Sequence, residues 1–101
     1  MFIVNLKFSE NKNRAKEYME GHNQWISQGF EDGVFLMVGS LQPGLGGSIL
    51  AYGLSREALE ARVAQDPFVA EAVVSSEILE IEPKKVDARL NFLLDDFQGK
   101  K

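Results

Sequence analysis

The chain has 101 residues, of which 45% are hydrophobic and 26% are charged. This length and composition are typical of one soluble globular domain, which can build a core without disulfide or metal cross-links. The chain has no cysteine, which excludes a disulfide framework, a thiolate nucleophile and a cysteine-ligated metal centre. Its formal net charge of −4 argues against nucleic acid or an anionic membrane as the main partner.

The segment from Met1 to Phe8 carries no basic lead, long apolar run or small-residue cleavage site, so we expect no secretion signal. No apolar stretch approaches the ~18 residues of a membrane span. We therefore expect a cytoplasmic protein with a single domain over residues 1–101. Its core would cover about residues 1–85, followed by a helical tail over about residues 86–97.

The first half of the chain predicts a strand, a helix and a second strand. Residues Phe2 to Phe8 alternate with the period of a half-buried strand. Beyond the capping oxygens of Ser9–Asn11, apolar residues recur every three or four positions as far as Gly29, which predicts a helix that ends there. Val34–Val38 is apolar on both faces and predicts a strand that breaks at Gly39.

The second half predicts a hairpin, a helix and a last strand. The glycine-rich segment Pro43–Gly47 connects to a third strand, Ser48–Tyr52, which is again apolar on both faces. Ser55 caps a second helix, which ends before Pro67 because the residue preceding a proline avoids helical geometry. A fourth strand follows over about Ala72–Ile81.

This order of elements, βαββαβ, is that of the ferredoxin-like α+β fold, in which two helices cover one face of a four-stranded antiparallel sheet. The second and third strands are apolar on both faces, so we expect a second subunit to pack sheet against sheet in a homodimer. Beyond Pro83, apolar residues at helical spacing predict an extra C-terminal helix, which folds back on its own subunit or clasps the other. They are Val86, Leu90, Leu93, Leu94 and Phe97.

The only histidine, His22, is the candidate acid or base. It lies on the apolar stripe of the first helix, where a histidine is more often a core residue than a catalytic one. Its side chain is nevertheless the one that normally exchanges a proton near neutral pH. Asp66 by itself suits a simple turn. The predicted fold, however, returns Asp66 beside the first helix, where its carboxylate would orient the His22 ring and form a proton-transfer dyad.

Three further residues are candidates for lining a pocket. Ser40 has no neighbouring histidine or lysine, which favours a polar lining role over a nucleophilic one. Trp25 either walls the pocket or fills the core, and Phe68 is the third lining candidate. We expect no metal and no cofactor, because Glu31 and Asp32 serve a short turn and the glycine-rich segment opens no helix that would hold a phosphate.

Several of these motifs resemble the YCII-related (YciI-like) protein family. They are the Glu-Asp-Gly turn after the helix histidine, the strand ending in Gly39-Ser40-Leu41 and, above all, Asp66-Pro67-Phe68-Val69-Ala70-Glu71-Ala72-Val73. The resemblance extends from Met1 to about Lys85. It implies a dimeric α+β barrel built from ferredoxin-like subunits. It also implies a His-Asp pair in a pocket, a role that falls here on His22 and Asp66.

The resemblance narrows the chemistry without naming a substrate. A dehydrochlorinase of chlorinated hydroxyaromatics belongs to the same superfamily, and muconolactone isomerases are similar in fold. Many members of the family carry an arginine and a proline just before the histidine, where this chain has Tyr18-Met19-Glu20-Gly21. If that arginine binds an anionic substrate, an acidic ligand here requires a replacement from Arg14, Arg62 or Arg89.

Three functions remain open. The first is a dimeric, cofactor-free enzyme in which His22 moves a proton on a small cyclic or aromatic molecule, by isomerase, lyase or dehydrochlorinase-like chemistry, while Asp66 orients the ring. The second is a non-catalytic small-molecule-binding or oligomerisation module. The third, by fold analogy alone, is a haem or oxygen-dependent monooxygenase. A contact between His22 and Asp66 at the wall of an open pocket would favour the first.

Overall fold

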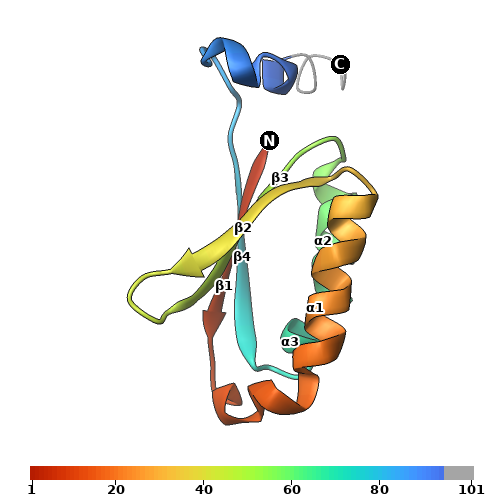
Figure 1. Ribbon diagram of the computed structural model, residues 1–101, viewed down its shortest axis with the longest axis vertical. Coiled ribbons are helices and arrows are strands. Elements are labelled where there is room, and N and C mark those ends of the chain that lie inside the picture. The colour runs from red at the N-terminus through yellow and green to blue at the C-terminus, as the bar shows by residue number, and fades with distance from the viewer. Residues whose placement is uncertain (95–101) are drawn as a thin grey trace.

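The computed structural model describes residues 1–94, which form an antiparallel four-stranded sheet with helices on one side (Figure 1). The strands are β1 (Phe2–Phe8), β2 (Phe35–Leu41), β3 (Gly46–Ala51) and β4 (Val74–Glu80). The helices are α1 (Ala15–Glu31), α2 (Arg56–Ala64) and α3 (Pro67–Ala70), with short 3-10 turns η1 (Lys12–Arg14) and η2 (Ala88–Leu90). Within the described part of the chain, no helix combines the length and apolarity needed to cross a membrane.

The strands lie in the order β2-β3-β1-β4, so β1 pairs with both β3 and β4. This α+β arrangement is compatible with the ferredoxin-like fold that the order of elements predicted. The first strand has the bounds that its alternation indicated. Ser55 also caps α2 as expected, because its hydroxyl oxygen accepts the N–H of Ala58 at 3.1 Å.

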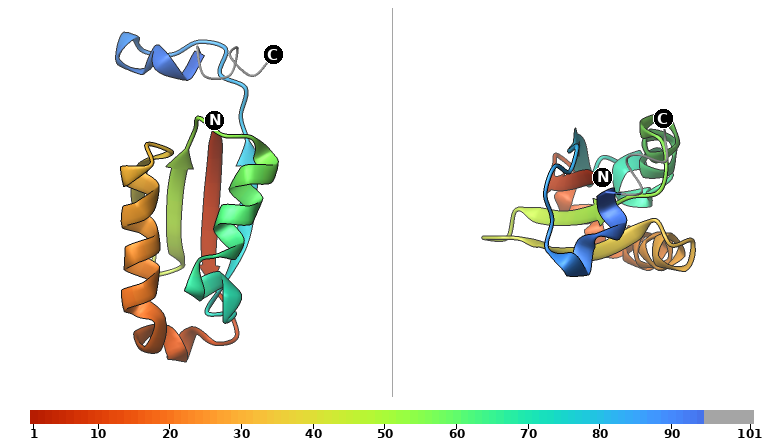
Figure 2. Two further views of the ribbon diagram at one scale, coloured as in Figure 1. Left: turned by 90° about the vertical axis from the view of Figure 1, so that its right-hand side faces the viewer. Right: turned by 90° about the horizontal axis from the view of Figure 1, so that it is seen from above.

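The core lies between the sheet and the helices. Phe2, Val4 and Leu6 of β1 point toward the helices and are at most 3% exposed. Val4 stands opposite Ile49 of β3, which is also buried on this side of the sheet. In Figure 2, α1 and α2 lie over the sheet on this side, so the alternating side chains of the strands meet both helices.

The opposite face of the sheet carries a row of apolar side chains that crosses all four strands. Ile3 stands opposite Leu50 on one side and Leu79 on the other, and Leu50 stands opposite Met37. Met37 is 59% exposed and Leu79 is 44% exposed, so residues 1–94 leave this row partly uncovered. The second and third strands are therefore apolar on both faces because one face packs in the core and the other face carries this row.

Several predicted boundaries were wrong, and at two of them tertiary contacts explain the difference. The first helix continues past Gly29 to Glu31. Gly29 is buried inside it because the Phe35 ring occupies the place where a Cβ atom would project. The second strand continues through Gly39 as far as Leu41, because residues 46–48 of β3 pair with its last three residues.

The C-terminal helix begins later than predicted. Residues 84–87 are not helical, and the first helical turn is η2, where the Asp87 carboxylate accepts the N–H of Arg89 at 2.9 Å. Residues 92–94 are helical again, and Phe97 lies outside the described residues. This tail lies beyond the end of the sheet where the N-terminus lies (Figures 1 and 2). It contacts the rest of the chain through an edge-to-face pair between Phe92 and Tyr52, with ring centroids 5.2 Å apart.

Candidate active site

His22 and Asp66 are in direct contact. Nδ1 of His22, on α1, lies 2.8 Å from Oδ1 of Asp66, which precedes α3. The Asp66 side chain is wholly buried, whereas the His22 side chain is 13% exposed. The fold therefore brings together two residues that are 44 positions apart, as the predicted topology indicated. Asp66 reaches the outside only through His22, which makes His22 the member of the pair that a ligand can touch.

The local sequence Asp66-Pro67-Phe68 holds the carboxylate in place. Asp66 is the N-cap of α3, and its Oδ1 accepts the backbone N–H of Phe68 at 3.0 Å. Pro67 occupies the first helical position, where its missing N–H is no loss. Gly21 lets this turn approach α1, because a Cβ atom at position 21 would lie 3.1 Å from the Pro67 ring. The turn is thus built to present one carboxylate oxygen to His22.

Phe68 holds the imidazole from one side. Its ring is stacked on that of His22, with centroids 3.9 Å apart and planes 6° from parallel. The Trp25 ring lies farther from His22, at 6.1 Å between centroids. With Nδ1 bound to Asp66 and one ring face against Phe68, the imidazole has one orientation that satisfies both contacts.

The hydrogen bond to Asp66 decides which ring nitrogen serves a ligand. When Nδ1–H donates to the carboxylate, Nε2 keeps its lone pair and is the ring nitrogen that can accept a proton. The second carboxylate oxygen, Oδ2, is buried and has no hydrogen-bond partner within residues 1–94. The polar contacts of the Asp66 side chain therefore run through Oδ1 alone, which serves both the α3 cap and His22.

His22 lines an open cavity of about 380 Å³ between α1 and the sheet. This volume lies at the small end of the range for small-molecule sites, about 300–1,000 Å³. The cavity is lined by Leu6, Phe8, Met19, His22, Asn23, Ile26, Val38, Gly39, Ser40, Gly46, Gly47, Ser48, Ile49, Phe68 and Val74. Two of the three predicted lining residues, Ser40 and Phe68, are among them.

Trp25, the third lining candidate, does not line this cavity. It is 9% exposed and packs in the core, where its ring meets Phe35 edge to face with centroids 5.2 Å apart. Its indole N–H donates to the backbone oxygen of Arg62 at 2.9 Å. Of the two alternatives that the sequence left open for Trp25, the structure shows the core position.

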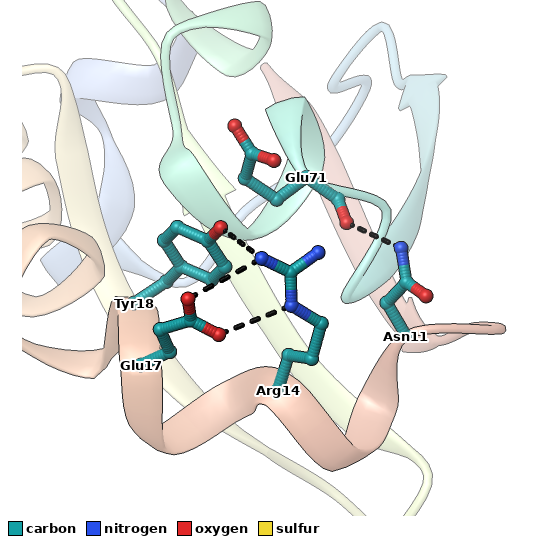
Figure 3. Close-up of polar contacts among 5 residues, drawn as sticks. All are labelled: Asn11, Arg14, Glu17, Tyr18 and Glu71. Atoms are coloured by element: carbon teal, nitrogen blue, oxygen red, sulfur yellow. Dashed lines mark hydrogen bonds and ion pairs between the residues drawn. The ribbon is translucent and has the colours of Figure 1, made fainter.

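A second polar cluster stabilises the start of α1 beside the site (Figure 3). The Arg14 guanidinium donates to Glu17 at 3.0 Å and to the Tyr18 hydroxyl at 2.6 Å. Asn11 donates to the backbone oxygen of Glu71 at 2.9 Å, which ties this end of α1 to the turn after α3. The hydrogen bond from Arg14 lowers the pKa of Glu17, and burial raises the pKa of Tyr18. No sequence pattern indicated the contact between Asn11 and Glu71, which are 60 positions apart.

Other features of the lining escaped sequence reasoning. Asn23, one residue after His22, contributes a polar side chain, and the glycines at 39, 46 and 47 leave part of the lining to the backbone. Their only sequence signal was a glycine-rich hairpin, which suggested a turn rather than a cavity. Within residues 1–94, no three or more side chains of histidine, cysteine or acidic type gather as a metal site would require.

Comparison with protein-family models and with curated proteins finds no match to this chain.

Proposed function

We propose that the protein is a small enzyme in which His22 and Asp66 transfer a proton on a small cyclic or aromatic molecule without a cofactor. The observation that carries this proposal is the 2.8 Å contact between Nδ1 of His22 and Oδ1 of Asp66 at the wall of an open cavity. A histidine that only filled the core would have no reason to face a cavity with a buried carboxylate behind it. Isomerase, lyase and dehydrochlorinase-like steps all need this one transfer.

In the proposed reaction, Nε2 of His22 removes a proton from the ligand. The Nδ1–H bond to Asp66 then stabilises the positive charge that develops on the imidazole. An isomerisation ends when Nε2 returns the proton to another atom of the ligand. An elimination ends when the electron pair of the broken C–H bond forms a double bond and expels the leaving group, and Nε2 then releases the proton to water or to that group. Phe68 keeps the ring in place through both steps, since it stacks on the imidazole at 3.9 Å.

A non-catalytic ligand-binding module is the second candidate. It is favoured by one observation: His22 is the only titratable side chain that lines the cavity within the described residues. A second acid or base, if the reaction requires one, must then come from the ligand, from water or from another subunit. Detection of ligand binding without any turnover would support this alternative.

We further propose that the chain belongs to the YCII-related family and forms a dimeric α+β barrel. The Asp-Pro-Phe turn supports the family assignment, because Asp66 binds His22, Phe68 stacks on it and Pro67 begins the helix that holds both in place. The partly uncovered apolar row of Ile3, Leu50, Leu79 and Met37 supports the dimer, because an identical row on a second copy would cover it.

The test of the proposed activity compares His22→Gln with the native protein on a panel of hydroxyaromatic compounds and lactones, including their hydrogen–deuterium exchange in D₂O. We expect turnover or exchange in the native protein to fall by about 10² to 10⁴ in the variant. Gln24→Ala, on the exposed side of the same helix, serves as the matched control and should keep full activity. Equal rates in native protein and His22→Gln would exclude His22 from the chemistry.

A further inference from the structure

We infer that the cavity at His22 selects an uncharged, mostly apolar molecule with one hydroxyl or carbonyl group, and that Gly47 sets its size limit. The inference deepens the proposed function because it concerns the same cavity, but it is tested by binding alone.

The lining is apolar apart from a few neutral polar groups. Eight of its residues have apolar side chains, and no lysine, arginine, aspartate or glutamate is among them. A ligand carboxylate would therefore lose water without gaining a cationic partner among the lining residues, which is unfavourable. Protonated His22 is no substitute, because Asp66 already balances its charge through Nδ1.

The arginines that might have replaced the missing cation are used elsewhere. Arg14 pairs with Glu17 at 3.0 Å (Figure 3), and Arg62 pairs with Asp32 at 3.0 Å. Arg89 pairs with Asp87 in the C-terminal tail. None of them lines the cavity. Within residues 1–94, none of these three arginines therefore replaces the arginine that an acidic ligand would require.

Neutral polar groups remain available to a ligand. Asn23 and Ser40 line the cavity, and neither side chain makes a hydrogen bond within residues 1–94. The Ser48 hydroxyl, by contrast, donates to Asn5 at 2.8 Å. An amide, a hydroxyl and the His22 imidazole together match a hydroxyl or carbonyl group on an otherwise apolar molecule.

Gly47 controls the room above the sheet. It stands opposite Leu6 and Ser40, in the row of residues that faces the helices. A Cβ atom at this position would touch only the Gly39 oxygen, at 3.3 Å, so a side chain here would project into the cavity. Gly46 differs, because it has φ +138° and a Cβ atom would clash with Leu6. Gly47 is therefore the glycine that a larger residue can replace to fill the cavity.

Two planar probes that differ chiefly in charge, benzamide and benzoate, test the inference by NMR titration of the native protein. We expect benzamide to shift the amide resonances of Gly47 and Ser40 with a Kd in the millimolar range, and benzoate to bind at least about tenfold more weakly. Gly47→Val should abolish benzamide binding and Gly47→Ala should weaken it. Ser75→Val, which adds bulk to β4 outside the cavity, should leave it unchanged.

Three results would overturn the inference: benzoate binding as tight as that of benzamide, no benzamide binding, or benzamide binding that survives at Gly47→Val. If that variant does not fold, as judged by its thermal unfolding, Gly47→Ala decides. The ammonium of Lys12 lies 4.9 Å from the centroid of the Phe8 ring. If benzoate binds, loss of its binding in Lys12→Ala would show that Lys12 is the cation that binds it. Benzamide binding without His22-dependent turnover would support this inference and contradict the proposed function. His22-dependent turnover without benzamide binding would support the proposed function and contradict this inference.

Discussion

The Phe68 ring is stacked on the His22 ring, with centroids 3.9 Å apart and planes 6° from parallel. The same residue also donates its backbone N–H to Asp66 at 3.0 Å. Phe68 thus contacts both members of the dyad, one through its side chain and one through its backbone. A change to its side chain therefore alters the packing against the His22 ring but keeps the backbone hydrogen bond to the Asp66 carboxylate.

Phe68→Leu should therefore lower activity without removing the dyad. The leucine keeps an apolar side chain and the backbone N–H, but it loses the ring that restrains His22. We expect kcat to fall about tenfold and the free energy of unfolding to fall by about 1 to 2 kcal/mol. Steady-state kinetics and urea denaturation measure the two effects. Unchanged kcat, with stability alone reduced, would show that the stack only fills space.

Gly29→Ala should destabilise the fold strongly. The added methyl group would meet the Phe35 ring, which packs against Trp25 in the core. We expect a loss of about 1 to 3 kcal/mol in the free energy of unfolding, measured by urea denaturation. Gly39→Ala is the matched control, because a Cβ atom there has nothing within 4 Å. Equal stability of the two variants would contradict the close packing at Gly29.

Stability should decrease in acid through Asp32. Hydrogen bonds from Gln28 and then Arg62 lower the pKa of Asp32 below 3.8, its ordinary value. A carboxyl group whose pKa is lower in the folded state stabilises the fold above its unfolded pKa, and this contribution is lost as the pH falls through the folded pKa. We expect Asp32→Asn to reduce stability at pH 7 and to have less effect near pH 3. Unfolding curves at both pH values measure this difference, and an equal effect would contradict the pairing.

Met37→Lys should disrupt the proposed dimer. It places a charge in the apolar row of the open sheet face, where Met37 stands opposite Leu50. We expect the native chain to sediment at twice its 11.3 kDa mass and the variant to shift toward the monomer. Gln24→Lys adds the same charge to the exposed side of α1 and should leave the dimer intact. A native protein that sediments as a monomer would contradict the dimer proposal.

The sequence by itself determined the features that depend on neighbouring residues. The alternation of Phe2 to Phe8 predicted β1 with its observed bounds, and Ser55 predicted the cap of α2. The order of elements predicted an antiparallel four-stranded sheet, and that topology brought Asp66 within reach of His22. The strand and the cap follow because periodicity and capping act over a few residues, whereas the topology follows from the order of the elements along the chain.

Only the tertiary structure decided the features that depend on distant partners. Gly29 looked like the end of a helix, but it lies inside α1 because Phe35 needs the space of its missing side chain. Trp25 was equally compatible with a pocket wall until packing placed it in the core. The positions of Gly47 and of the arginines relative to His22 depend on strand register and ion pairing, which no local pattern encodes. The dyad was therefore foreseeable from the order of the elements, whereas the shape and charge of the cavity around it depended on long-range packing.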